Sequence, residues 1–375
     1  MKFMSEKIKV LFFMETVDGG GAEKVLRNLV NNMDQDRFDI TVQTVFPDGG
    51  ANLLNPGIRY RSMYSARTKT TELLYRLEAA CGLAYPLRMR DRYDMECAYL
   101  ECGATKVLAG STNRRAVKLA WVHCDLQKAM KDPAAFAAKT APYYRKYNRV
   151  VCVSDLGQQS FRELFGDEIP TVIVRNTVDC EEIRENATAE VMDLPGKPLV
   201  VSLGRLAEPK CYLRMLKAHK RLIEEGVYHH LLILGEGPDR ALLEQYVDAH
   251  GLRNTVSMPG FRSNPYPYLK AADILACSSI YECFSTFVTE GLILGKPIVT
   301  TDVSGMRELL GDSEHGLITR IDDEDFYEGL KKLLQDESLR QAYACKATVR
   351  GEDFETEKLV SATESFFEDC IHNGR

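Results

Sequence analysis

No apolar run in this 375-residue sequence reaches the roughly 18 residues that a membrane-spanning helix needs. The best N-terminal candidate, residues 10–14, is too short for the core of a signal peptide, and Glu15 follows it at once. We therefore expect neither a spanning segment nor export. The expected location is the cytoplasm, with peripheral contact at the inner face of the membrane as an option.

Paired cysteine patterns are also missing. The 11 cysteines are an odd number in a long chain, which argues against a disulfide framework. Cys97 and Cys102 are the closest pair, but they lack the two-residue spacing of a zinc knuckle, and no second pair faces them. We expect reduced, mostly buried thiols and no metal site.

The composition shows no extreme that would indicate a disordered, collagen-like or coiled-coil chain, with 45% hydrophobic and 27% charged residues. The length is too great for one ordinary core and suits two domains. Residues 1–185 carry 27 Lys and Arg against 24 Asp and Glu, whereas the rest carries 21 against 30. This acidic balance argues against a dedicated nucleic-acid binder, and no nucleic-acid partner is expected.

Several catalytic signatures are absent. The sequence has no G-x-S-x-G and no H-E-x-x-H, and it shows no internal repeat of fixed period. Residues 291–296 approach a phosphate-binding P-loop, but one residue is missing between the glycines and Pro297 replaces Ser or Thr. These absences argue against hydrolases of those kinds and against P-loop enzymes.

Short apolar runs alternate with longer helical patterns throughout, which predicts an α/β protein with two Rossmann-like domains, each built on a parallel sheet. Residues 1–180 form the first predicted domain and residues 199–355 the second, joined by a charged linker at 181–198. The predicted strands are residues 8–14, 39–45, 95–100, 119–122, 149–153, 171–174, 199–203, 230–234, 255–258, 274–277, 297–300 and 316–318.

Ligands of open parallel sheets bind beyond the carboxyl ends of the strands, so the loops that follow the predicted strands are the candidate sites. After the first strand, Gly20 and Gly21 belong to a triple glycine that precedes a helical pattern. Their backbone N–H groups could approach an anion closely at a helix N-terminus. The spacing does not match G-x-G-x-x-G, so NAD binding is weakly supported, and a flexible turn is the alternative.

In the second half, Gly204, Arg205 and Lys210 follow the first predicted strand, and the two cations could clamp a diphosphate. A solvated basic loop explains them equally well. Gly235 permits a tight turn after the next strand. Further along, Phe261 and Arg262 again follow a strand and offer an aromatic ring and backbone groups to a flat base.

Glu282 and Glu290 carry the most weight. They stand eight positions apart, and at a rise of about 1.5 Å per residue the separation is at most about 12 Å, comparable with the distance from the sugar to the ribose of a nucleotide sugar. The residues between them predict a helix start whose N–H groups would point at a diphosphate. Two surface charges on a helix are the alternative. The flanking positions counted with this site are Phe284, Ser285, Thr286 and Phe287.

In order along the chain, these residues resemble the retaining glycosyltransferases of family 4, which have the GT-B architecture of two Rossmann-like domains facing across a cleft. Glu282 and Glu290 match the E-x7-E of that family, with Arg205 and Lys210 upstream at the familiar distance. The resemblance covers nearly the whole chain, through residues 19–23, 121–123, 153–154, 174–179, 204–210, 235–238, 282–290, 295–299 and 301–302.

The resemblance implies transfer of a sugar from a nucleotide diphosphate donor with retention at the anomeric carbon, without a metal and with no cofactor beyond the nucleotide sugar as substrate. Arg205 and Lys210 would neutralise the leaving diphosphate. Glu290 would accept hydrogen bonds from the ribose, and Glu282 would hold the donor sugar. His123 would face the reacting sugar from the first domain. Asn176 also matches a family motif, and residues 356–375 would pack back on the first domain as a helix.

Three departures from the family bear on activity. The family usually has glycine at the places of Thr177, Cys211 and Cys283, where glycine permits unusual backbone angles. They keep a second hypothesis open, a non-catalytic partner subunit that binds a nucleotide sugar. A nucleotide-sugar epimerase or a phosphorylase would lack the E-x7-E. A UDP-sugar donor and a glycan or lipid-linked acceptor in surface polysaccharide synthesis are the expected partners.

A basic, tyrosine-rich segment lies in the first half. Mixed basic and amphipathic side chains suit an anionic membrane surface. A solvated, partly mobile loop is the alternative. Its basic residues are Arg59, Arg61, Arg67, Lys69, Arg76, Arg88, Arg90 and Arg92.

Overall fold

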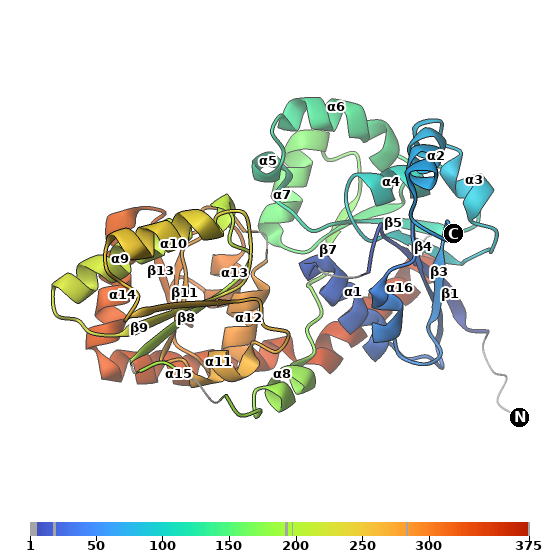
Figure 1. The fold of residues 1–375 in the computed structure, drawn as a ribbon. Coiled ribbons are helices and arrows are strands. Elements are labelled where there is room, and N and C mark those ends of the chain that lie inside the picture. The colour runs from blue at the N-terminus through green and yellow to red at the C-terminus, as the bar shows by residue number, and fades with distance from the viewer. Residues whose placement is uncertain (1–5, 18–19, 192–193, 197, 283, 374–375) are drawn as a thin grey trace, which may run out of the picture. The chain divides into compact units, whose positions relative to one another are not determined.

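The computed structural model describes residues 6–17, 20–191, 194–196, 198–282 and 284–373 (Figure 1). The chain forms two compact units. Unit 1 comprises Met1–Val178 and Thr356–Arg375, and unit 2 comprises Asp179–Glu355. The sequence predicts a linker at residues 181–198, but the first part of this segment is helical. Helix α8 (Cys180–Asn186) belongs to unit 2, and the Asp179 carboxylate caps it.

Unit 1 is built on a parallel sheet with the strand order β3-β2-β1-β4-β5-β6-β7. The order reverses between β1 and β4, so the loops after these two strands diverge to opposite faces and leave a crevice at the carboxyl edge. The strands are β1 (Ile8–Phe13), β2 (Phe38–Thr44), β3 (Arg59–Ser62), β4 (Met95–Ala98), β5 (Val117–Val122), β6 (Arg149–Cys152) and β7 (Thr171–Ile173).

Helices cover both faces of this sheet, as near-continuous burial of its strands requires. Leu11 and Phe13 pack on one face in a core that includes Tyr144 and Phe161, whereas Phe12 points to the opposite face. The helices are α1 (Gly21–Asn32), α2 (Lys69–Ala80), α3 (Ala84–Arg88), α4 (Gly103–Leu108), α5 (Leu126–Ala129), α6 (Pro133–Tyr144), α7 (Asp155–Phe165) and α16 (Thr356–Asn373), with a 3-10 turn at Gly49–Leu53.

The C-terminal helix α16 is part of unit 1. Its Phe367 is fully buried, with ring centroids 6.0 Å from Phe12 and Trp121 and 6.3 Å from Phe38. Arg37, just before β2, pairs with Glu364 on the same helix at 2.8 Å. The last helix therefore completes one face of the first sheet although more than three hundred residues separate it from β1.

Unit 2 contains a second parallel sheet, of order β10-β9-β8-β11-β12-β13, which reverses between β8 and β11. Core residues of α9, α10 and α14 pack together with β8 and β9. Its strands are β8 (Leu199–Leu203), β9 (His230–Leu234), β10 (Val256–Gly260), β11 (Ile274–Cys277), β12 (Ile298–Thr301) and β13 (Leu317–Thr319). Its helices after α8 are α9 (Tyr212–Glu224), α10 (Arg240–Ala249), α11 (Tyr266–Ala271), α12 (Thr286–Ile293), α13 (Met306–Leu310), α14 (Asp323–Gln335) and α15 (Glu337–Gly351), with 3-10 turns at Glu208–Lys210 and Glu352–Phe354.

The two-sheet α/β prediction is confirmed, and each predicted strand is present with its ends within two residues. Strand β3 was not predicted. Its residues Arg59, Tyr60, Arg61 and Ser62 show no apolar run, because β3 is an edge strand whose burial alternates between exposed and intermediate. The described cysteines are free thiols, and of these Cys81, Cys102 and Cys345 are exposed.

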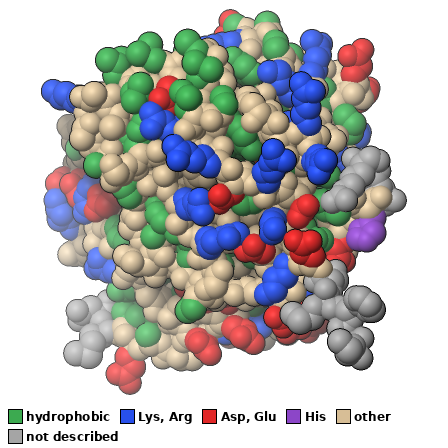
Figure 2. All heavy atoms as spheres, turned by 90° about the vertical axis from the view of Figure 1, so that its right-hand side faces the viewer, with side chains coloured by type: hydrophobic (Ala, Val, Ile, Leu, Met, Phe, Trp, Pro, Cys, Tyr) green, Lys and Arg blue, Asp and Glu red, His purple; other side chains and the backbone are tan. Residues whose placement is uncertain are grey.

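The basic segment of unit 1 is largely structured. Four of its arginines form ion pairs, so their charge is partly neutralised by neighbouring carboxylates. The face in Figure 2 accordingly shows basic side chains with acidic ones among them. No described helix is long and apolar enough to cross a membrane. The pairs are Arg59–Asp39 at 2.9 Å, Arg61–Asp91 at 2.8 Å, Arg67–Glu72 at 2.7 Å and Arg88–Glu78 at 2.5 Å.

Truncating Phe367 to Ala should lower the free energy of unfolding by roughly 3–5 kcal/mol, because it opens a cavity among three aromatic rings. The neighbouring Phe366 is only partly buried, so Phe366→Ala should cost clearly less. Urea unfolding followed through the fluorescence of Trp121, the sole tryptophan, measures both variants in unit 1. Equal losses would mean that α16 does not seal this face.

Candidate active site

The predicted donor-binding residues lie in unit 2 on loops and on helix α12, at or beyond the carboxyl ends of strands. The central ones follow β8 and β11, the neighbouring strands between which the strand order reverses. Ligands of open α/β sheets bind at this position. The unit 2 residues of the predicted site are Gly204, Arg205, Lys210, Gly235, Phe261, Arg262, Glu282, Phe284, Ser285, Thr286, Phe287 and Glu290.

Lys210 and Glu282 are brought into direct contact, the Lys210 Nζ donating to Glu282 Oε1. Both side chains are mostly shielded, at 26% and 12% exposed. Burial by itself would lower the pKa of the Lys210 ammonium, but the Glu282 carboxylate, together with the nearby Cys277 and Tyr212, outweighs burial and the pKa is raised. Ser279 Oγ donates a second hydrogen bond to Glu282 Oε1 at 2.7 Å. The two charges sit beside each other at the switch point of the sheet.

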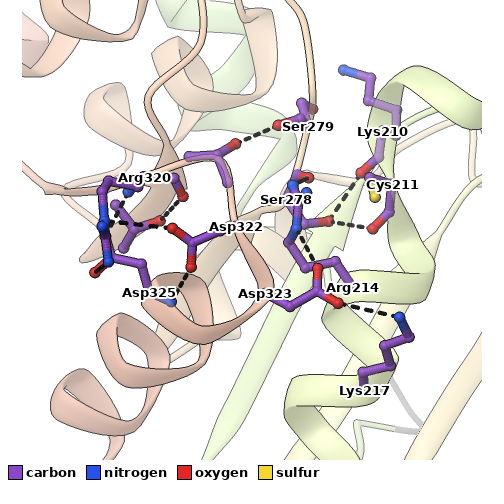
Figure 3. A network of polar contacts seen from close by, with 12 residues as sticks. Lys210, Cys211, Arg214, Lys217, Ser278, Ser279, Arg320, Asp322, Asp323 and Asp325 are labelled. Atoms are coloured by element: carbon purple, nitrogen blue, oxygen red, sulfur yellow. Dashed lines mark hydrogen bonds and ion pairs between the residues drawn. The ribbon is translucent and has the colours of Figure 1, made fainter.

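A polar network holds the loop after β8 against the loop after β11 (Figure 3). Ser278 Oγ donates to the carbonyls of Lys210 at 2.9 Å and Cys211 at 3.1 Å. Arg214 donates to the Ser278 carbonyl at 3.0 Å and pairs with Asp323 at 3.0 Å. The loops that carry Lys210 and Glu282 are thus tied together by side-chain hydrogen bonds to main-chain carbonyls.

Sequence reasoning missed Ser278 and Ser279. Both follow β11 directly, and Thr301 at the end of β12 donates to the Ser279 carbonyl at 2.5 Å. The available signal was a pair of small polar residues immediately after a fully buried strand, which is where polar groups of a site are expected.

Cys211 has a left-handed backbone, with φ of 48°. This is the place after Lys210 where the resemblance leads one to expect glycine, which adopts such angles without a steric cost. The Cys211 carbonyl is held by Ser278, so the surrounding contacts enforce the conformation. A cysteine here keeps the glycine-like turn at an expected cost of about 1–2 kcal/mol.

Gly235 lies against Gly204, and both belong to the loops that the sequence indicates as candidate substrate-binding sites. A Cβ on Gly235 would come within 1.9 Å of the Gly204 carbonyl oxygen, and its φ is +143°. Gly235 N also donates to the Gly260 carbonyl at 3.0 Å. Close packing of the loops after β8, β9 and β10 therefore requires glycine at this position.

The predicted helix start at Ser285 and Thr286 is confirmed. Helix α12 begins at Thr286, and the Ser285 side chain caps it by accepting from Val288 N at 3.4 Å. Phe287 is buried in the same turn. Phe284 is buried with its ring centroid 6.3 Å from Phe354. Cys283 lies outside the described residues.

Glu290 is a buried carboxylate on α12, only 5% exposed. Its Oε1 accepts from the hydroxyl of Tyr266 at 3.3 Å. Tyr266 is the first residue of α11, another residue that the sequence did not single out. The alternative considered from the sequence, a surface charge, therefore does not hold for Glu290, because the helix face that carries it is covered.

The remaining unit 2 residues differ in what they contact. Arg205 is exposed. Phe261 is also exposed and presents its ring to solvent. Arg262 instead folds back on its own loop, donating to the Pro259 carbonyl at 2.8 Å. Arg205 is thus the more available of the two arginines for an incoming anion.

The other predicted residues, Gly20, Gly21, His123 and Asn176, belong to unit 1. Gly20 caps α1, and the Glu23 carboxylate folds beside it, where burial raises the Glu23 pKa. Gly21 has open space where a Cβ would stand. The glycine loop therefore already has a carboxylate at its helix start.

His123 follows β5 and is packed 5.0 Å from the Tyr99 ring. Its backbone N donates to Glu101 Oε1, whereas neither ring nitrogen has a hydrogen-bond partner among the described residues. Burial lowers the His123 pKa and outweighs the opposite effect of Glu101. Asn176 Oδ1 is likewise buried without a described partner. Within the described ranges, no group of three or more His, Cys, Asp and Glu is placed to hold a metal ion.

Glu282→Gln should lower the free energy of unfolding of unit 2 by about 1.5–3 kcal/mol, because the shielded Lys210 ammonium loses its charged acceptor. Glu236→Gln is the matched control, since Glu236 pairs with Arg240 at a more exposed position, and it should cost at most about 1 kcal/mol. Urea unfolding followed by circular dichroism gives both values.

The pH dependence has a defined sign. Because the Lys210 pKa is raised in the folded state, the stabilisation is complete at neutral pH and disappears only when alkaline pH deprotonates the ammonium. The stability difference between wild type and Glu282→Gln should therefore shrink above about pH 10. A difference that vanishes already at neutral pH would contradict the ion pair.

Residues 184–350, within unit 2, match the family model described as Glycosyl transferases group 1. The chain is 35% identical over 190 residues to the N-acetylgalactosamine-N,N'-diacetylbacillosaminyl-diphospho-undecaprenol 4-alpha-N-acetylgalactosaminyltransferase of Campylobacter jejuni, covering 50% of this chain and 51% of that protein. It is 29% identical over 211 residues to the lipopolysaccharide core biosynthesis glycosyltransferase LpsE of Rhizobium meliloti, covering 54% and 58%. The chain spans about half the length of these curated relatives.

Solved structures resemble nearly the whole chain. HepE of Anabaena in complex with UDP-glucose superposes with a TM-score of 0.77 at 18% identity, covering 96% of this chain and 100% of that one. Sucrose-phosphate synthase of Thermosynechococcus elongatus gives a TM-score of 0.77 at 16% identity, covering 98% and 100%. At such identities the likeness shows the fold. The chain has the GT-B fold, with a segment in its second unit that matches group 1 glycosyl transferases.

Proposed function

We propose that the chain is a retaining glycosyltransferase of family 4 that moves a sugar from a UDP-sugar to a glycan or lipid-linked acceptor in surface polysaccharide synthesis. The observation that carries the proposal is the Lys210–Glu282 pair at the switch point of unit 2, inside the segment that matches the family model. The names of the two curated relatives, one acting on a diphospho-undecaprenol lipid and one in lipopolysaccharide core synthesis, support the acceptor class.

In this proposal the donor diphosphate meets Arg205 and Lys210. Arg205 is exposed and would reach the anion without breaking an ion pair to a described residue, whereas Lys210 would exchange the Glu282 carboxylate for a phosphate oxygen. Such an exchange would conserve the charge balance of Lys210 and release Glu282 to accept hydrogen bonds from sugar hydroxyls. The cations stabilise the negative charge that grows on the leaving diphosphate.

Two further residues complete the proposed roles. Glu290, beside Tyr266, would accept hydrogen bonds from the ribose. His123 would meet the reacting sugar from unit 1, as a neutral imidazole at pH 7 because burial lowers its pKa. A neutral ring keeps one nitrogen able to accept a hydrogen bond from a hydroxyl.

Arg205→Ala should weaken UDP-sugar binding by roughly 10- to 100-fold, since it removes a charge-assisted contact of about 1.5–3 kcal/mol, while stability stays within about 0.5 kcal/mol of wild type. Arg253→Ala is the control, because Arg253 is an exposed arginine that precedes β10 at the amino edge of the same sheet. Calorimetric titration with a panel of nucleotide sugars measures the affinities.

In a thermal-shift assay with the same panel of nucleotide sugars, the donor at about 100 times its dissociation constant should raise the free energy of unfolding of wild type by roughly 2.7 kcal/mol. A panel in which no nucleotide sugar stabilises the protein would favour the alternative, a non-catalytic partner subunit. Equal affinities of wild type and Arg205→Ala for a donor that does bind would remove Arg205 from the site.

Retention and metal independence are tested together. Proton NMR of the first product should show the anomeric configuration of the donor sugar, and transfer should continue with excess chelator because Arg205 and Lys210 supply the positive charge. An inverted product would exclude the retaining mechanism. Activity that requires an added divalent ion would show that the two cations are insufficient.

A further inference from the structure

Helix α2 of unit 1 has an unusual distribution of side chains. Its only buried residue is Glu78, whereas its leucines face solvent, with Leu73 58%, Leu74 39% and Leu77 55% exposed. Leu83, the N-cap residue of α3, and Leu87, near the end of that helix, are 48% and 51% exposed. A surface helix normally buries its apolar stripe and exposes its charges. These five residues, the leucine face, are therefore an unpartnered apolar surface on two consecutive helices.

The polar side of α2 explains this orientation. The Glu78 carboxylate accepts from Arg88 Nε at 2.9 Å and Nη2 at 2.5 Å, and from the Tyr64 hydroxyl at 2.6 Å. The Arg88 guanidinium also lies 4.4 Å from the Tyr64 ring centre. On the same side Tyr75 donates to Glu15 at 3.0 Å. These contacts hold the side of α2 that carries Tyr75 and Glu78 against the rest of unit 1. The leucines of α2 are therefore exposed to solvent.

The charges beside the leucine face are positive. Lys69, Leu73, Arg76 and Leu77 stand at positions i, i+4, i+7 and i+8, so they form one stripe of α2. Both cations are exposed, and neither forms an ion pair with a described residue. Glu72, one turn from Arg76 and within its electrostatic range, is paired with Arg67. Figure 2 shows hydrophobic side chains over the upper part of this face, with basic side chains beside and below them.

We propose that the leucine face of α2 and α3 docks unit 1 on a bilayer that contains anionic lipids. Leucines on one side of a helix enter the boundary between headgroups and acyl chains, and flanking cations attract the negative surface. Arg59, Arg61, Arg67 and Arg88, which the sequence grouped with this surface, are paired with carboxylates and contribute less. Such docking would bring the protein to the membrane that holds the proposed lipid-linked acceptor. It rests on the proposed function only for this biological purpose, because lipid binding itself needs neither a donor nor turnover.

The test is co-sedimentation of the full chain with vesicles of equal parts phosphatidylglycerol and phosphatidylcholine, without nucleotide sugar. Leu73→Ser combined with Leu77→Ser should reduce the fraction bound by at least roughly tenfold. Leu242→Ser is the matched control and should bind as wild type, since Leu242 is a 53% exposed leucine on α10 of unit 2. Lys69→Gln with Arg76→Gln should weaken binding roughly tenfold at low salt and little at high salt.

Three results would overturn the proposal. Wild type could fail to bind the vesicles, or the double leucine variant could bind as wild type does. Sedimentation velocity without lipid could also show a dimer that only the leucine substitutions dissociate, in which case a second copy covers the face. Circular dichroism confirms that the variants fold, and sugar transfer to a water-soluble acceptor tests the proposed function separately from docking.

Discussion

The ion pair between Lys210 and Glu282 organises the carboxyl edge of the sheet in unit 2. It joins the loops that follow β8 and β11, the neighbouring strands between which the strand order reverses, and the Ser278 hydroxyl donates to main-chain carbonyls at the same junction. A shielded pair stabilises little relative to apolar residues of the same volume, but it is costly to break when one partner is lost. Its presence at a switch point is therefore better explained by a need for both charges than by stability. An arriving anion can take the place of the carboxylate without leaving the ammonium unpaired.

Backbone geometry constrains this region as strongly as charge does. Gly235 approaches the Gly204 carbonyl too closely for any side chain, and Cys211 holds a left-handed turn that glycine would adopt without strain. Strain in a residue persists when surrounding contacts over-determine it, here through the Ser278 hydroxyl. The departure from glycine at Cys211 therefore changes the side chain offered to the site while the path of the backbone stays the one that glycine would favour.

Much of the fold could be predicted because parallel strands buried on both faces read as apolar runs. Strand β3 could not be predicted in this way, because an edge strand with arginines at alternate positions has no apolar run. For the site, the sequence could place Lys210 and Glu282 each after a strand, but 72 positions separate them and nothing local predicts that they touch. Burial of Glu290 depends on Tyr266 from another helix, so periodicity within α12 could not reveal it. The position of Ser278 and Ser279 directly after β11 could have indicated a site, but uncharged side chains gave no further signal.

Helix α2 of unit 1 follows the same rule, that a carboxylate shielded from solvent needs a charged or hydrogen-bonding partner. In unit 2 the partner of Glu282 is Lys210. In unit 1 the partners of Glu78 are Arg88 and Tyr64. The Arg88 guanidinium lowers the pKa of Glu78, while burial and the adjacent carboxylate raise the pKa of Tyr64 to about 12, so the group carries one negative and one positive charge at neutral pH. A helix can turn its glutamate inward only when such partners replace water. Once it does, its leucines must face outward, and the exposed apolar face follows from the buried charge.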